Sequence, residues 1–172
     1  YSGPGACGWS AQEVAANAAP TLEALRKEFP GVIIGDIEPV PPPAAPAQWL
    51  DGYHDWLDAY RAAVGSDLDF FHADVAWQWG LWKDGVAALR QHLARRGIAF
   101  GMIYFGDDTD QSDAEWLDRA AERFAEHEIG AGYSPDHVIF QSWHVYPKRL
   151  LPETRRDTFT NLINRYFRTR TR

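Results

Sequence analysis

Apolar positions along the chain alternate between helical spacing, in which they recur every three or four residues, and short uninterrupted runs. The first helical stretch opens with a capping box, in which Ser10 accepts from first-turn amides and Glu13 reaches back. We expect this helix to run towards Phe29 and to bend or split at Pro20, which removes a helical hydrogen bond. The same periodicity predicts further helices at residues 47–64, 81–96, 112–124 and 152–167.

Short apolar runs bounded by turn residues separate these helices. Such runs are typical of strands that are buried on both faces of a parallel sheet. They predict strands at residues 32–38, 68–74, 98–105 and 137–143, so that one strand–helix unit takes 30 to 39 residues. The alternation predicts an α/β fold in a single domain over residues 1–172, with a parallel sheet and right-handed crossovers.

Two architectures are compatible with this alternation. A (β/α)₈ barrel takes about 250 residues, so the units of this chain would make roughly half of one. An open doubly wound sheet of about four or five strands would suit the length better. In both architectures the reactive groups lie at the carboxyl ends of the strands, so the candidates for a functional site are the residues found there.

Composition narrows the classes of function. The 172 residues are 45% hydrophobic, which suffices for one core, and Cys7 is the single cysteine, which excludes a disulfide framework. A formal net charge of −7 argues against a nucleic-acid binder, and no apolar run approaches the ~20 residues of a membrane span. No Gly-rich phosphate loop joins a strand to a helix, and we expect no cofactor. The chain begins with Tyr1 rather than Met, which leaves the compartment open, with secretion after removal of an upstream segment as one candidate.

Polar and aromatic side chains follow all four predicted strands. The strand period places Asp36 and Glu38 on one face of the first strand, and likewise His72 and Asp74 on one face of the second. Asp107 follows the third strand. Each residue alone is equally well explained by packing or capping, but four strands that end this way indicate a site. The candidates for substrate binding are His72, Trp77, Gln78, Tyr104, Gln141, Trp143 and His144.

Carboxylates combined with Trp, Tyr, Gln and His suit sugar chemistry. A sugar ring stacks its CH face on an aromatic ring, and its hydroxyls hydrogen-bond with polar side chains. Cleavage of a glycosidic bond needs one carboxylic acid as proton donor and a second group that stabilises or attacks the oxocarbenium-like centre. Glu38 is the best candidate for the acid, because desolvation at the tip of an apolar strand favours its protonated form. Candidates for the second role are Asp36, Asp74 and Asp107.

A metal site is the competing interpretation of the same residues. His72 and Asp74 have the spacing of metal ligands, and His144 is the only other histidine that we expect nearby. The other histidines fall on predicted helices or at a strand start, where they would not converge, so we expect no metal. A flavodoxin-like or metal-dependent α/β enzyme stays open as an alternative, with Asp107 and Asp108 completing its site.

Two strand ends resemble those of glycoside hydrolases with a (β/α)₈ barrel. The segment from Gln141 to Trp143 resembles the end of the eighth strand in the large clan of retaining barrel glycosidases, where a Trp floors the sugar site. The segment from Asp36 to Glu38 is similar to the acidic strand motif of chitinase-type barrels, where the Glu is the proton donor. The resemblance implies that the chain is the carboxyl-terminal half of such a barrel, with its four strands as strands five to eight.

Four parallel strands cannot close a barrel alone, and their free edges and apolar inner face favour association. We therefore expect a homodimer or larger assembly, in which two copies supply eight strands. The expected function is cellulase-like hydrolysis of a β-linked polysaccharide such as a β-glucan. The alternative is a non-catalytic, carbohydrate-binding relic of a barrel that has kept its aromatic floor.

Overall fold

A parallel sheet of four strands in the order β1-β2-β3-β4 forms the centre of the molecule. The computed structural model describes residues 7–40, 49–77, 82–130 and 132–170. The strands are β1 (Gly35–Val40), β2 (Phe70–Val75), β3 (Ala99–Tyr104) and β4 (His137–Phe140). The helices are α1 (Ala11–Glu28), α2 (Trp49–Val64), α3 (Trp82–Arg96), α4 (Asp113–Phe124), which continues into the π-helical turn η2 (Ala125–Gly130), and α5 (Phe159–Arg170). The predicted α/β fold is confirmed.

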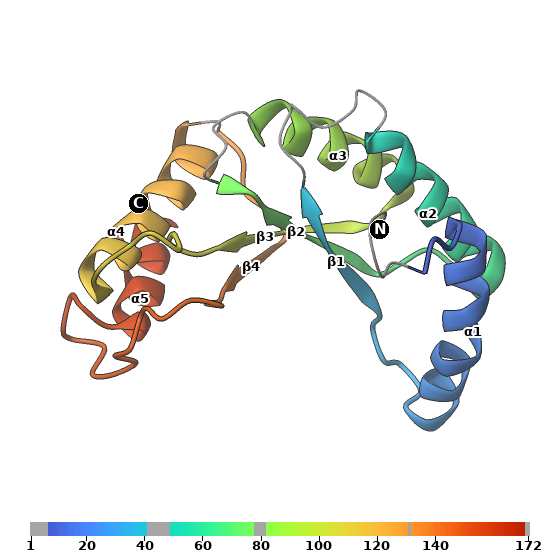
Figure 1. Cartoon of the computed structure of the whole chain (residues 1–172), viewed down its shortest axis with the longest axis horizontal. Helices are drawn as coiled ribbons and strands as arrows, with labels where there is room; N and C mark the ends of the chain where they lie inside the picture. Colours follow the sequence, from blue (N-terminus) through green and yellow to red (C-terminus); the bar gives the residue numbers. More distant parts are fainter. Residues whose placement is uncertain (1–6, 41–48, 78–81, 131, 171–172) are drawn as a thin grey trace.

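The order of the strands decides between the two architectures. A doubly wound sheet reverses its strand order at a switch point, whereas consecutive strands of a barrel lie side by side. Here each strand pairs in parallel with the next strand along the chain. Figure 1 shows the helices in an arc around one side of the strands, with none of the described helices on the other side. The four βα units therefore have the layout of half a (β/α)₈ barrel.

The main core lies between the sheet and the helices. Alternate residues of the strands point into it, among them Phe71 and Ala73, which are fully buried against helix residues such as Trp116. The residues between them point to the opposite face, where Ile37 is 54% exposed and His72 is half-buried. The sheet therefore has one face covered by helices and one open face.

Helix α1 is continuous, so the predicted split at Pro20 is wrong. Pro20 lies on the exposed side of the helix, where water can hydrogen-bond the carbonyl that has lost its donor. The predicted capping box is confirmed, because Ser10 N donates to Glu13 Oε2 over 2.7 Å and Glu13 N donates to Ser10 Oγ over 3.2 Å. None of the described helices is both long and apolar enough to span a membrane.

A loop replaces the beginning of the last predicted helix. Strand β4 ends at Phe140, and α5 begins at Phe159 instead of residue 152. Thr158 is fully buried, and its Oγ1 donates to the carbonyl oxygens of Pro152 over 2.8 Å and Arg155 over 2.9 Å. These bonds fold the segment back on itself as a loop, a local competition with helix that Thr side chains commonly provide.

Candidate functional site

A hollow of about 280 Å³ lies at the carboxyl ends of β1, β2 and β3, closed on one side by the segment after β4. Parallel strands end at the same edge of a sheet, which brings residues distant in sequence together there. Five candidate residues named from the sequence line this hollow: Asp74, Asp107, Asp108, Trp143 and His144.

Asp74 is a carboxyl group of the hollow whose pKa is raised. It occupies the end of β2 on the open face of the sheet, opposite Pro39 in the register of the two strands. Its side chain is half-buried, and none of the described residues donates a hydrogen bond to it. Desolvation by burial raises the pKa of Asp74 above the ordinary value, because burial penalises the charged carboxylate. Asp74 therefore keeps a proton at a pH where an exposed aspartate has lost it.

Asp107 has the opposite character. Its Oδ1 accepts from Thr109 Oγ1 over 3.0 Å, and its Oδ2 accepts from the Arg123 guanidinium over 3.0 Å. Burial alone would raise the pKa of Asp107, but the hydrogen bonds from Thr109 and from the neighbouring carboxyl of Asp108, together with the charge of Arg123, outweigh it and lower the pKa to about 2. Asp107 is therefore ionised throughout the physiological range.

Asp74 and Asp107, two of the three carboxyl groups that line the hollow, thus have pKa values moved in opposite directions. Such a difference is the usual sign that one carboxyl donates a proton while the other stabilises positive charge. Asp74 and Asp107 follow neighbouring strands and both line the hollow. The arrangement can protonate a leaving group and, in the same space, stabilise a cationic centre.

An exposed aromatic ring lies beside the carboxyl groups. Trp143 is 78% exposed although it is a large apolar side chain, and it lines the hollow together with His144. Ser142 holds this segment in a turn, since its Oγ accepts from His144 N over 3.2 Å and donates to the carbonyl of Tyr146. An indole presented in this way can stack on the CH face of a sugar ring.

Asp36 and Glu38 lie on the other face of the sheet. The register pairs Asp36 with Phe71 and Glu38 with Ala73, and both partners point into the helix-covered core. Asp36 Oδ2 accepts from Trp56 Nε1 over 2.6 Å, so this carboxylate joins β1 to α2. Neither residue lines the hollow that Asp74 and Asp107 share. The two residues do share a face, as the strand period predicts, but it is not the face of Asp74.

Two further candidates belong to the core. Trp77 is 5% exposed, donates from Nε1 to the carbonyl of Ile103 over 3.1 Å and stacks on Tyr104 at 5.6 Å between ring centroids. Tyr104 is fully buried and donates to Glu128 Oε1 over 2.9 Å.

Gln141 is half-buried just after β4, outside the lining of the hollow, and Gln78 lies outside the described residues.

His72 lies on the open face but is paired with another histidine. Its Nε2 is 3.1 Å from Nδ1 of His137, so the expectation that His137 would not converge with it is wrong. Gly101 makes this possible, because a Cβ there would lie 2.4 Å from Cδ2 of His72. The two rings come from β2 and β4 and meet across Gly101 of the intervening strand β3, an arrangement that depends on the strand order and register and that strand prediction alone does not give. Among the described residues no three His, Cys, Asp or Glu side chains gather as a metal site.

Arg123 and Asp110 are the members of the site that the sequence reasoning missed. Asp110 is 4% exposed, and its Oδ2 accepts from the backbone N of Asp107 over 2.6 Å while its Oδ1 accepts from Arg119 Nε over 2.8 Å. Arg119 and Arg123 are four residues apart, which places both on one face of α4 beside the loop after β3. That spacing was the signal available in the sequence.

Comparisons with protein-family models, with curated proteins and with solved structures find no match to this chain. The geometry of the hollow is therefore the basis on which a function can be proposed.

Proposed function

We propose that the protein is a glycoside hydrolase that cleaves a β-linked polysaccharide such as a β-glucan. The observation that carries this proposal is the pairing, in one hollow, of Asp74 with a raised pKa and Asp107 with a pKa of about 2. Glycosidases use a protonated carboxyl and a second carboxylate on either side of the scissile bond. The exposed Trp143 beside the pair supports a sugar as the substrate.

In this proposal the residues have separate roles. Asp74 donates its proton to the glycosidic oxygen as the bond breaks, and Asp107 stabilises the positive charge that develops on the sugar ring. A water molecule then adds to the anomeric carbon and returns a proton to Asp74. Trp143 forms the stacking floor, and His144 hydrogen-bonds a hydroxyl. The acid role that the sequence assigned to Glu38 passes to Asp74, because Glu38 lies on the helix-covered face.

The test is release of reducing sugar from β-glucans, xylan, mannan and chitin by the wild type, Asp74→Asn and Glu38→Gln. We expect release from at least one polysaccharide, its loss in Asp74→Asn and its retention in Glu38→Gln. Circular dichroism establishes that each variant is folded. Loss only in Glu38→Gln would return the acid role to that residue, and a wild type without release from any polysaccharide would contradict the glycosidase proposal.

One observation favours a second function, carbohydrate binding without catalysis. Both oxygens of Asp107 are already engaged, Oδ1 by Thr109 and Oδ2 by Arg123, which limits its freedom to attack a sugar. A barrel-like protein that has lost catalysis would still stack a sugar ring on Trp143 but would not cleave the sugar. It would bind cello-oligosaccharides without cleaving them, and Trp143→Ala would weaken that binding, whereas Phe167→Ala, at another exposed ring on α5, would not.

For the assembly we propose that the open face of the sheet is completed by a second copy of the chain. Among the described residues, β1 and β4 each pair with one strand, so each has an edge that no described strand covers. Two four-stranded sheets supply the roughly eight strands of a closed barrel. Ile37 is 54% exposed on this open face, which such an assembly would bury.

A further inference from the structure

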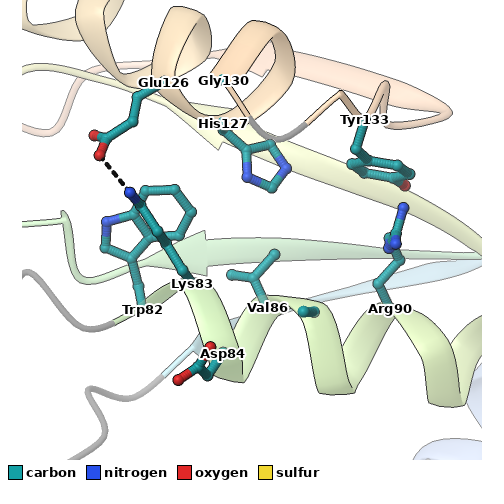
Figure 2. Close-up of a pocket in the computed structure, with 10 residues that line it drawn as sticks. Trp82, Lys83, Asp84, Val86, Arg90, Glu126, His127, Gly130 and Tyr133 are labelled. Atoms are coloured by element: carbon teal, nitrogen blue, oxygen red, sulfur yellow. Dashed lines mark ion pairs between the residues drawn. The ribbon is translucent and has the colours of Figure 1, made fainter.

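A second cavity, of about 430 Å³, lies on the helix side of the molecule between α3 and the π-helical turn η2. Figure 2 shows the His127 ring extending from η2 towards α3, with Trp82 and Arg90 below it and Tyr133 above Arg90. No part of the proposed glycosidase site belongs to this cavity. Its volume is in the range of pockets that hold small molecules.

His127 is the polar group at the centre of the cavity. It is only 6% exposed, it lines the cavity, and its Nε2 has no hydrogen-bond partner among the described residues. A buried polar atom without a partner is costly, so a ligand that bonds Nε2 would be stabilised there. The imidazole lies between aromatic rings, with centroids 5.5 Å from Trp82 and 5.7 Å from Tyr133. π-Helical turns of this kind are often found at functional sites.

Arg90 supplies a positive charge that no carboxylate of the described residues pairs with. Its guanidinium carbon lies 3.7 Å from the centre of the Tyr133 ring. The other cation of the cavity, Lys83, is already neutralised by Glu126, whose Oε1 is 2.7 Å from Nζ. Asp84 also borders the cavity, but Figure 2 shows its carboxylate pointing away from His127.

The imidazole of His127 is uncharged near neutral pH. Burial, and then the charge of Arg90, lower the pKa of His127 to about 4. The guanidinium and the imidazole lie at the same end of the cavity, because both are against the ring of Tyr133. A ligand there meets one cation and one neutral hydrogen-bonding ring, with the aromatic and aliphatic side chains of Trp82 and Val86 beyond them.

We propose that this cavity binds a small aromatic monocarboxylate, with its carboxylate between Arg90 and His127 and its ring against Trp82. The carboxylate would pair with the cation that has no ion-pair partner and accept a hydrogen bond from Nε2 of His127. A single uncompensated cation suits one negative charge, whereas a phosphate dianion would need a second. A neutral sugar would leave the charge of Arg90 without a counterion.

Isothermal titration calorimetry with benzoate as the probe tests the proposal. We expect benzoate to bind with a Kd near or below about 1 mM, and benzyl alcohol, which has the same ring without the charge, to bind at least about tenfold more weakly. Arg90→Gln should weaken benzoate binding at least about tenfold. The matched control is Arg95→Gln, which removes the same charge from an exposed position of α3 outside the cavity and should leave binding unchanged.

A second variant keeps the test decisive if Arg90→Gln fails to fold. Ala87 borders the cavity at an exposed helix position, so Ala87→Phe should obstruct the cavity without changing any charge and abolish benzoate binding. Loss of binding in Ala87→Phe, with wild-type binding in Arg95→Gln, would support the proposal. Absence of benzoate binding to the wild type at about 10 mM, or wild-type affinity in folded Arg90→Gln and Ala87→Phe, would overturn it.

Discussion

Arg123 of α4 donates a hydrogen bond to Oδ2 of Asp107 over 3.0 Å, and so ties the helix to the loop after β3. The same guanidinium also donates to the carbonyl oxygens of Phe105 and Gly106. Burial lowers the pKa of Arg123 to about 10, which still leaves it charged at neutral pH. The orientation of Asp107 in the hollow is therefore set by a helix that contributes no residue to the lining of the hollow.

Arg123→Met should destabilise the protein by about 3 kcal/mol, because it leaves a largely buried carboxylate without its counterion. The two side chains are 9% and 12% exposed, so water cannot replace the interaction fully. Urea unfolding followed by circular dichroism measures the change. In the more exposed pair of Arg165 with Asp118, Arg165→Met should cost less than about 1 kcal/mol. Equal losses in the two variants would show that burial adds nothing to the Arg123 pair.

The pH dependence of hydrolysis should report Asp74. A proton donor is active below its pKa, so kcat/KM should fall as the pH rises through the raised pKa of Asp74. Asp107, with a pKa of about 2, stays ionised over the same range and therefore causes no change of kcat/KM there. This decline should be missing from the residual activity of Asp74→Asn. A decline that persists unchanged in the variant would assign the titration to another group.

Acid should destabilise the fold through His127. Its pKa is about 4 in the folded protein, below the ordinary value of 6.5, so the unfolded chain takes up the proton first. The resulting stability is complete above the ordinary value, falls as the pH drops towards about 4, and changes no further below that. We expect a loss of a few kcal/mol across this window in urea titrations.

His127→Gln should reduce that pH dependence, since glutamine does not titrate. Burial also lowers the pKa of His72 and of His92, so part of the slope stays. His144→Gln is the matched control, because it removes a histidine from the half-buried segment after β4 instead. If both variants keep the wild-type slope between these pH values, His127 is not the group responsible.

Gly101→Ala should destabilise the open face of the sheet. The new Cβ would lie 2.4 Å from Cδ2 of His72 and 3.1 Å from Cβ of His137, so the rings must move, at a cost of about 1–3 kcal/mol. In a His72→Ala background the same substitution should cost less, because the closest ring is gone and only the 3.1 Å approach to Cβ of His137 remains. A double-mutant cycle by urea unfolding measures the coupling, and additive effects would contradict the contact.

Self-association should depend on the open face. Static light scattering of the wild type at micromolar concentration should give a dimer or larger species, and Ile37→Glu should shift it to the monomer by placing a charge on that face. Ile129→Glu alters an equally prominent apolar side chain, 65% exposed on η2, and should leave the assembly intact. A monomeric wild type would contradict the proposal that a second copy of the chain completes the open face of the sheet.

Local patterns sufficed for much of the fold but not for the arrangement of the site. The capping box at Ser10 and the four strands follow from short-range periodicity, which the folded chain keeps. The same periodicity places Asp36 and Glu38 on one face, but it cannot say which face the helices cover. That depends on the pairing of Asp36 with Phe71, a contact between distant segments.

Other features of the site depend on tertiary packing that single-sequence patterns do not record. The convergence of His72 and His137 needs both the strand order and the absence of a side chain at Gly101. The turn η2 continues a regular amphipathic helix with a wider hydrogen-bonding pattern, and no residue in it signals the change. The cavity around His127 was therefore invisible to sequence reasoning.

The strict succession of strand neighbours also determines how the molecule should come apart. Each βα unit is paired in the sheet only with the units before and after it, as in a short linear array of repeats. The units at the two ends have a single neighbour, so their backbone amides should exchange with deuterium earlier than those of β2 and β3. The protein would then unfold inward from its two ends. A contact that joins β1 to β4 would slow amide exchange at both ends together.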